Sequence, residues 1–588
     1  MLRLLKEMRK KEVLMTLICV IFILGQIYFD LKLPDYMSNL TIMIKSAEGG
    51  MSGIWQTGAR MLGCTLASAA LCIVCGYLSS SIAAGFSYAV REKLFGHIMD
   101  LGAQQMQELS VPSLITRTTN DITQIQMIMS MGLQTIVKAP VMAVWAVIKI
   151  LGKSWELSVV TAGFAAALII ISITIIAIVM PRFRIVQRLT DKINKTAREN
   201  LTGINVVHAF NAEDCQNAKF EETNAEMMRT QLFNQRMFAL MQPTMNLGMN
   251  GLTLCIYWVG ALLLSTIALS EAAARLTMFG NIVVFSTYAM YVVMSFVMMI
   301  MVFMMFPAAQ VSASRINEVL RRKSTIKEGS AEQGREEGTI EFKNVSFSYP
   351  GSTGEQLTDI SFKLNKGETI AFIGSTGSGK TTLLNLIARF YDASKGEVLV
   401  DGVNVKDYSF DTLYNIIGFA TQKPVLFSGT IEENIVFGES EQSPKQADIE
   451  KAAEIAQAKE FIEKSDGGYK HRIAQSGKNI SGGQKQRLSI ARVLARKPEI
   501  MIFDDSFSAL DYRTDAMLRS ALAKELKGTS CVIVAQRIST IRNADKIVVL
   551  DKGEAAGIGT HEELMKGCEV YREIAKSQLS EDELERAV

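Results

Sequence analysis

The sequence predicts an α-helical membrane domain of six spans followed by an α/β domain with a largely parallel sheet. Two observations lead to this fold class: long apolar runs occupy the first half of the 588-residue chain, and short β-rich runs alternate with helical segments in the second half. The chain is 48% hydrophobic and its mean hydropathy is slightly positive, which is uncommon for a soluble protein. The net charge is only +3 and no basic face is evident, which argues against nucleic acid as a partner.

The first half contains six runs long enough to cross a bilayer, a task that needs about 20 mostly apolar residues. They cover residues 13–33, 58–86, 133–152, 157–181, 246–269 and 278–306. Long charged helical connections follow the second and fourth runs, whereas the other connections are short and carry few basic residues. By the positive-inside rule, we expect the long connections and both termini in the cytosol. The chain is therefore expected to be a multi-pass protein of the cytoplasmic membrane.

Ionisable residues near or within these runs include Asp30, Arg60, Lys138 and Lys149. Charge in hydrocarbon is costly, so we expect such groups to face protein or water. Lys149 is expected to extend to an outer interface along its aliphatic stem. Lys138 lies nearer the cytosolic side, where it could line a pathway between the spans.

A change in composition divides the chain. Residues 321–338 are rich in charged residues, Gly and Ser, which indicates a linker between a membrane domain, 1–320, and a second domain, 339–588. In the second domain, strands are predicted at 340–349, 369–373, 397–400, 500–503, 531–535 and 546–550. Helical segments separate most of them, an alternation that is typical of a parallel sheet covered by helices.

The strongest motif is Gly374-Ser-Thr-Gly-Ser-Gly-Lys380-Thr381, a complete G-x-x-x-x-G-K-[ST], placed between a predicted strand and a predicted helix. Glycines let backbone N–H groups wrap a phosphate, and the helix N-terminus adds positive potential. Lys380 can reach the β- and γ-phosphates of a nucleotide, and the Thr381 hydroxyl can ligate Mg²⁺. The predicted ATP contacts are Gly374, Ser375, Thr376, Gly377, Ser378, Gly379, Lys380, Thr381 and Thr382.

A second element is the apolar run from Glu499 to Asp504, which reads as a buried strand ending in an acid. Such a strand can deliver a carboxylate to the Mg²⁺ beside a phosphate loop. Buried strands often end in Asp, so this signal is weak alone. Together with the phosphate loop, it predicts one nucleotide site.

The segment Asn479-Ile-Ser-Gly-Gly-Gln484 precedes a predicted helix and resembles the signature of ATP-binding-cassette (ABC) proteins. The resemblance implies that Tyr349 stacks on adenine and that Gln422 is the Q-loop glutamine, which senses Mg²⁺. Ser508–Asp511 resembles the D-loop, and Gln536 falls at the switch position. The implied Mg²⁺ ligands are Thr381, Gln422 and Asp504.

This resemblance extends over essentially the whole chain and includes the six-span arrangement of type IV, multidrug-type exporters. Residues 113–121 and 208–214 resemble the two coupling-helix regions of that family. Two cassettes of such proteins sandwich two ATP molecules, each lying between the phosphate loop of one chain and the signature of the other. One cassette per chain therefore implies a dimer, in which the ATP held by the partner is contacted by Ser481, Gly482, Gly483 and Gln484.

Two residues depart from the family pattern. Asp505 stands where the family's general base is normally Glu, and Gln536 stands where the switch residue is normally His. Aspartate is one methylene shorter, and a displacement of about 1 Å can cost on the order of a hundredfold in rate. Glutamine can hydrogen-bond a phosphate oxygen but cannot carry positive charge towards it. The two changes together imply a site that binds ATP and hydrolyses it slowly.

The intact signature then implies a heterodimer whose partner carries Glu and His together with an altered signature. Gln475, where homodimeric exporters usually have Glu, favours the same assembly. The implied catalytic residues are Asp505, Gln536, Gln422 and, acting on the partner's ATP, Ser481. The implied function is ATP-driven export of hydrophobic or amphiphilic compounds. Alternatives are a lipid or peptide exporter, a homodimer with slow hydrolysis, and a channel-type regulatory subunit.

A methionine stripe runs along the last predicted span at spacings of three and four residues, which places its members on one helix face. Its members are Met290, Met294, Met298, Met301 and Met305. A flexible, polarizable surface of this kind suits binding of varied apolar cargo. Packing against neighbouring helices or lipid is an equally simple interpretation.

Overall fold

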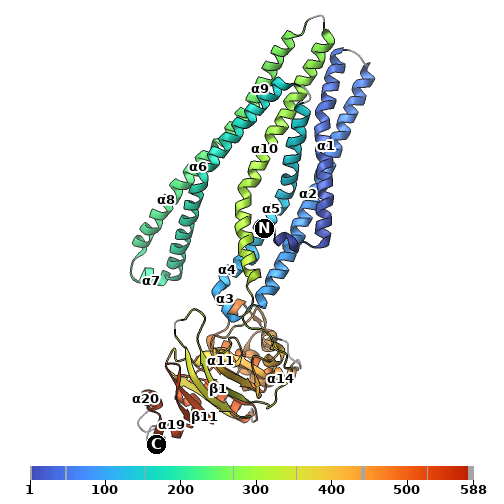
Figure 1. Ribbon diagram of the computed structural model, residues 1–588. Helices are drawn as coiled ribbons and strands as arrows, with labels where there is room; N and C mark the ends of the chain where they lie inside the picture. The colour runs from blue at the N-terminus through green and yellow to red at the C-terminus, as the bar shows by residue number, and fades with distance from the viewer. Residues whose placement is uncertain are drawn as a thin grey trace. The chain divides into compact units, whose positions relative to one another are not determined.

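The computed structural model describes residues 3–46, 50–151, 154–268, 271–352, 354–438, 444–525 and 528–579. The chain forms two compact units, each with its own contacts (Figure 1). The first comprises Met1–Met99 and Pro112–Arg321, and the second comprises Asp100–Val111 and Arg322–Val588.

The first unit is entirely helical in the part of the chain described. Its helices are α1 (Lys10–Ser46), α2 (Gly50–Met99), α4 (Val111–Thr116), α5 (Ile122–Leu151), α6 (Trp155–Thr202), α7 (Ile204–Ala209), α8 (Glu213–Ala239), α9 (Met241–Thr266) and α10 (Ala272–Arg321). Within the described residues, six helical stretches are long and apolar enough to cross a membrane. Each overlaps one of the six predicted runs, which confirms the six-span prediction; the fifth stretch ends at Thr266, before the predicted end of its run, and positions 152 and 269 lie outside the described residues.

These helices form two groups within the membrane unit. Helices α1, α2, α5 and α10 pack side by side, while α6 pairs with α8 and α9 in a long hairpin that diverges from them (Figure 1). The hairpin joins the first group through contacts of α9 and α6 with α10.

Two carboxylates on α1 tie the first group together. Asp30 accepts hydrogen bonds from Ser68 of α2 at 2.5 Å and from Lys138 of α5 at 3.3 Å. One and a half turns along α1, Asp35 accepts from Lys149 of α5 at 2.8 Å and from the Tyr288 hydroxyl of α10 at 2.8 Å. The Lys149 ammonium thus ends on a carboxylate of a neighbouring helix, and this pairing offsets the cost of charge among apolar helices.

The second unit is α/β. Its strands are β1 (Ile340–Phe347), β2 (Leu357–Leu364), β3 (Thr369–Gly374), β4 (Lys395–Val400), β5 (Val403–Asn404), β6 (Ile417–Ala420), β7 (Gly429–Thr430), β8 (Arg472–Ile473), β9 (Ile500–Asp504), β10 (Ser530–Val534), β11 (Lys546–Asp551) and β12 (Glu554–Gly559). Its helices are α3 (Ala103–Leu109), α11 (Lys380–Ile387), α12 (Phe410–Ile416), α13 (Ile431–Ile435), α14 (Gln446–Ile455), α15 (Lys459–Lys464), α16 (Gly482–Ala495), α17 (Tyr512–Glu525), α18 (Ile538–Ile541), α19 (His561–Gly567) and α20 (Glu569–Gln578).

The predicted parallel sheet is present, with strand order β12-β11-β3-β10-β9-β6 and only the β11–β12 pair antiparallel. Val534 of β10 lies beside both Phe372 of β3 and Asp504 of β9 in the register. The carboxyl ends of these strands therefore meet at one edge, where open α/β sheets bind their ligands. The runs at 340–349 and 397–400 instead form β1 and β4 of a separate antiparallel sheet, ordered β2-β1-β4-β5.

The segment before β1 lies along the α/β unit. Gly329 and Ala331 donate backbone hydrogen bonds to Tyr408 and Asp407, respectively, and Ala331 forms a bridge with Tyr408. The backbone N–H groups of Arg335 and Glu336 donate to the Asp401 carbonyl at 2.6 and 2.9 Å. These contacts belong to the second unit, which begins at Arg322 after α10.

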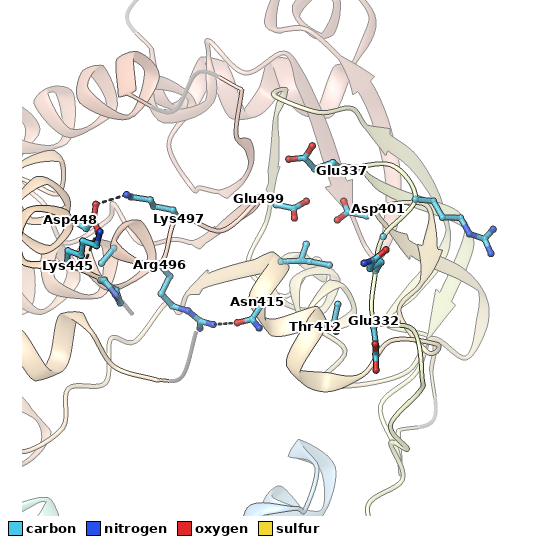
Figure 2. A pocket seen from close by; sticks show the side chains of 16 residues that line it. Glu332, Glu337, Asp401, Thr412, Asn415, Lys445, Asp448, Arg496, Lys497 and Glu499 are labelled. Carbon is cyan, nitrogen blue, oxygen red and sulfur yellow. Dashed lines mark hydrogen bonds and ion pairs between the residues drawn. The ribbon is translucent and has the colours of Figure 1, made fainter. Parts of the chain in front are cut away.

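Asp401 lies at the centre of this contact and is 2% exposed. Its Oδ1 accepts from the Thr339 N–H at 3.0 Å, and its carboxyl is hydrogen-bonded to that of Glu499, which lines the same cleft of about 930 Å³ (Figure 2). Burial and then the negative charge of Glu499 raise the pKa of Asp401 to about 7. The folded state thus favours the protonated form, whereas the unfolded chain ionises near the ordinary value of about 4. The contribution of protonated Asp401 to the free energy of unfolding is therefore complete below about pH 4, and it is lost as the pH rises to about 7.

Asp401→Asn is expected to abolish most of this pH dependence, since the amide mimics the protonated carboxyl and can donate to Glu499. In the wild-type chain, hydrogen-exchange protection of the Arg335, Glu336 and Thr339 amides should fall by up to about tenfold per pH unit between pH 5 and 7. In the variant it should stay nearly constant after correction for intrinsic exchange. Asp448→Asn is the control: Asp448 lines the same cleft, but hydrogen bonding and pairing with Lys497 lower its pKa. An unchanged slope in Asp401→Asn would assign the pH dependence to another group.

Candidate nucleotide-binding site

The phosphate loop connects β3 to α11 at the carboxyl edge of the parallel sheet. Gly377 and Gly379 adopt φ values of +85° and +100°, a region that L side chains rarely adopt. At Gly374, a Cβ would lie 2.1 Å from the Leu550 carbonyl oxygen, so the loop can approach β11 only because that residue is glycine. Ser375, Thr376 and Gly377 form an exposed crest, while Ser378 and Thr382 are buried beneath it.

Lys380 occupies the mouth of this loop. Its ammonium group donates to the carbonyl oxygens of Gly374 and Ser375 at 2.8 and 2.7 Å. Burial lowers the pKa of Lys380, while the nearby Asp505 and Asp504 carboxylates oppose that shift. The lysine is therefore held by the loop itself, with its charge directed to where a nucleotide's terminal phosphates would bind.

Two of the three implied Mg²⁺ ligands, Thr381 and Asp504, meet beside the loop. The Thr381 hydroxyl donates to Asp504 Oδ1 at 3.3 Å, and Asp504 is 3% exposed at the end of β9. Burial raises the pKa of Asp504 to about 6, so a cation at this position would stabilise its ionised form. A hydroxyl and a carboxylate oxygen at the mouth of a phosphate loop are hard donors, which fit Mg²⁺.

The two residues that depart from the family pattern contact each other. Gln536 Nε2 donates to Asp505 Oδ2 at 2.9 Å, and Gln422 also hydrogen-bonds the Asp505 carboxylate. The Asp505 backbone N–H donates to the Val534 carbonyl at 2.9 Å, with φ at +46°. Burial raises the pKa of Asp505, against the hydrogen bonds that lower it. Asp505 is 7% exposed, and Gln536 and Gln422 are among the side chains that already hydrogen-bond its carboxylate.

Tyr349 lies next to the start of α11. Its hydroxyl is 3.1 Å from the Thr382 hydroxyl, and its ring meets the rings of Phe347 and Tyr391 edge to face at 4.9 and 5.2 Å. These contacts orient the half-buried ring beside the phosphate loop, as the proposed adenine contact requires.

The signature forms a separate exposed feature at the N-terminus of α16. Ser481 caps the helix: its hydroxyl accepts from the Gln484 N–H at 3.3 Å, and Gln484 Oε1 accepts from the Ser481 N–H at 3.0 Å. Ser481 and Gly482 are exposed, and no atom lies within 4 Å of a Cβ built on Gly482. Among the described residues, no hydrogen bond joins this group to the phosphate loop, so its open N–H groups are available to a second molecule.

One residue that contacts the site is missing from the sequence-based set. Gln578, at the end of α20, accepts from the Ile538 N–H at 2.9 Å and donates to the Gln536 carbonyl at 2.8 Å. It thus holds the backbone on both sides of Arg537. In the sequence, the amphipathic pattern of α20 indicates only that this helix packs against the domain. Nothing in that pattern indicates that Gln578 contacts Gln536.

The methionine stripe belongs to α10, a helix of the membrane unit. Met290, Met294 and Met301 are exposed, and Met298 and Met305 are half-buried. Phe285 and Tyr288 on the same helix are fully buried against its neighbours. The stripe therefore lies on the side of α10 that this chain's own helices leave uncovered.

Comparisons with known proteins identify both halves of the chain. Residues 16–296 match the family model described as "ABC transporter transmembrane region", and residues 357–508 match that described as "ABC transporter". An uncharacterised ABC transporter ATP-binding protein of Mycobacterium tuberculosis is 35% identical over 538 residues, covering 90% of each chain. An ATP-dependent lipid A-core flippase of Aromatoleum aromaticum is 30% identical over 506 residues, covering 86% of this chain and 82% of that one. The structure of a bacterial Atm1-family ABC exporter with ATP bound superimposes with a TM-score of 0.80 at 22% identity, covering 97% of this chain and 99% of that one, a likeness of fold.

Proposed function

Because the chain belongs to the ABC transporter family, we propose that it is one half of a heterodimeric exporter of hydrophobic or amphiphilic compounds and carries the slowly hydrolysing ATP site. The family membership makes it an ATPase-coupled, multi-pass membrane protein with a C-terminal ATP-binding domain. The proposal adds the direction of transport, the unlike partner, the cytoplasmic membrane as location and the cytosol as the location of the cassette.

The observation that carries the proposal is the 2.9 Å hydrogen bond between Gln536 and Asp505. A general base must reach the attacking water, but this short carboxylate is turned towards a neutral amide. The raised pKa of Asp505 does not compensate, because it is the length and orientation of the side chain that separate it from the water. ATP binding is preserved, since Lys380 and the loop are intact.

In the proposed cycle, ATP binding closes the two cassettes, and the coupling regions 113–121 and 208–214 transmit closure to the spans. Mg²⁺ held by Thr381, Asp504 and Gln422 would neutralise charge on the β- and γ-phosphates. Ser481 and the amides of α16 would bind the γ-phosphate of the ATP on the partner's phosphate loop. Hydrolysis there resets the transporter, while ATP on this chain's loop holds the cassettes together.

The proposal is tested by purifying the chain with whatever subunit accompanies it. We expect a second half-transporter with Glu after its strand acid, His at its switch position and a changed signature. The chain alone should bind ATP and hydrolyse it slowly. Brisk hydrolysis and transport by this chain alone would instead indicate a homodimer.

Asp505→Glu combined with Gln536→His is expected to raise hydrolysis at this chain's own site by roughly tenfold to a hundredfold, since the carboxylate gains reach and the switch residue can carry charge. Single-turnover measurements with the partner's site disabled would record the gain. Asp505→Asn is the control, because it preserves side-chain length and removes the base. No gain in the double variant, with normal ATP binding, would mean that the partner's signature limits the rate instead.

A lipid-type cargo is the second candidate. It is favoured by the name of the Aromatoleum aromaticum relative, a lipid A-core flippase, and by the apolar, uncovered methionine face on α10. Transport of labelled drugs and labelled lipids into inside-out vesicles, with the partner present, would decide between the two classes.

A further inference from the structure

A groove of about 820 Å³ runs between α6 and α9 on the diverging hairpin of the membrane unit. Its walls are largely apolar and include Phe164 and Leu168 of α6 and Leu247 and Leu254 of α9. At Leu254 it meets a second hollow of about 510 Å³ beside Tyr257 and Trp258. The two hollows form one continuous track along α9.

Glycines allow the close helix contact that forms the floor of the groove. A Cβ on Gly248 would lie 2.5 Å from Leu168 Cδ2, and one on Gly251 would lie 3.2 Å from Phe164 Cε1. These contacts also fix the register of the two helices: Gly248 is level with Leu168.

This register places the groove well inside the apolar layer. The Arg182 guanidinium lies 3.7 Å over the Phe233 ring and marks the end of the apolar stretch of α6. Leu168 precedes Arg182 by fourteen residues, which is about 21 Å along a helix. The apolar stretch of α6 begins at Leu157, eleven residues before Leu168, so the groove lies near the middle of that stretch.

Two asparagines line the groove at this depth. Asn246 and Asn250 are one turn apart on the same face of α9, and both are exposed. Asn246 accepts a hydrogen bond from Gln242 at 3.3 Å, whereas the Asn250 amide has no partner among the residues that the structure describes. Exposing an unpaired amide to lipid tails is costly, because lipid offers no hydrogen bonds. The Asn250 amide therefore requires a polar partner inside an apolar groove, and Asn246 can add a hydrogen bond one turn away.

The charge of the groove restricts that partner. None of the described residues that line it is acidic or basic. A cation or an anion would thus enter hydrocarbon without a counter-charge, at high cost. The groove therefore fits a neutral molecule. Its apolar body would contact the uncharged walls, and a polar group that both donates and accepts hydrogen bonds would pair with the asparagine amides.

We propose that the α6–α9 groove binds a neutral amphiphile, with Asn246 and Asn250 hydrogen-bonding its polar group and the apolar walls holding its chain. Its role as a cargo site rests on the proposed export function; the binding itself does not. The methionine face of α10 is a separate surface. The asparagines of the groove favour ligands that carry a hydrogen-bonding group, whereas the thioether side chains of the methionine face do not.

The test uses the full chain with its partner in lipid nanodiscs and two photoreactive probes of equal chain length. One is an N-alkyl gluconamide with a diazirine in its chain, and the other is the diazirine alkane without the polar group. The gluconamide should label peptides of α6 and α9, and Asn246→Leu with Asn250→Leu should reduce that labelling at least tenfold. Alkane labelling should not fall, and Asn250→Gln should retain gluconamide labelling.

Thr253→Val is the matched control, because the Thr253 hydroxyl donates to the Met249 carbonyl of its own helix at 2.9 Å and does not line the groove. Unchanged gluconamide labelling in the double leucine variant would overturn the proposal. So would a photoreactive residue at position 250 that cross-links to the partner's helices and never to lipid-like probes. If labelling depends on the asparagines but no probe is transported in vesicles, the site stands and the export function fails.

Discussion

Ser481→Ala is expected to reduce ATP turnover of the assembled transporter by roughly a hundredfold, which is typical of removing one donor that stabilises a developing anion. Ser481 stands exposed at the N-terminus of α16 and has no hydrogen bond to this chain's phosphate loop among the described residues. Its hydroxyl would contact the γ-phosphate of the partner's ATP, at the site that hydrolyses. Steady-state ATPase activity of the heterodimer is the measurement.

The serine also caps a helix, so its loss has a structural cost of about 1 kcal/mol that must be separated from catalysis. Thr560→Ala provides the control, because Thr560 caps α19 with the same reciprocal geometry: its hydroxyl accepts from the Glu563 N–H at 3.4 Å, and its N–H donates to Glu563 Oε2 at 2.8 Å. Thr560→Ala should leave turnover nearly unchanged. Near-normal turnover in Ser481→Ala would reverse the assignment of the two sites.

Lys380→Ala is expected to lower the number of bound ATP molecules from two to one per heterodimer, with at least a hundredfold weaker binding at this chain's loop. The lysine supplies the only ammonium in the phosphate-loop motif, and burial strengthens its attraction for phosphate by removing competing water. Equilibrium dialysis with labelled ATP under non-hydrolysing conditions measures the stoichiometry. Turnover at the partner's loop should persist, although more slowly, if ATP on this chain holds the cassettes together.

Lys395→Ala serves as the control, because Lys395 is exposed and pairs with Glu355 at 2.9 Å on the surface of the same unit. It should leave the stoichiometry at two. Two molecules still bound by Lys380→Ala would remove the basis for assigning the phosphate loop. Complete loss of turnover in Lys380→Ala, with Ser481→Ala active, would place hydrolysis on this chain.

Features that depend on neighbouring residues were predictable from the sequence. The six spans follow from runs of apolar residues, and the phosphate loop from glycines and a lysine within eight positions. Strand β9 and its terminal Asp504 follow from an apolar run that ends in an acid. Each of these patterns lies within one helix, strand or turn, where local sterics, hydropathy and hydrogen bonding determine the conformation.

Features that depend on distant residues were not predictable in the same way. Gln536 and Asp505 were each recognised as departures, but their contact depends on the parallel register of β9 and β10. Nothing near Gln578 indicates that it holds the backbone at Gln536. The pairing of Lys149 with Asp35 joins two residues that are 114 positions apart in the sequence.

The sequence by itself therefore determined the class of molecule: six membrane spans and an ATP-binding cassette, with Asp505 directly after the strand acid. Only the tertiary structure decided that Asp505 is hydrogen-bonded to Gln536, that two antiparallel runs leave the main sheet, and that asparagines line an apolar groove. The physical reason is that hydropathy and local geometry act within one segment, whereas hydrogen bonds and cavities between segments exist only after those segments have packed.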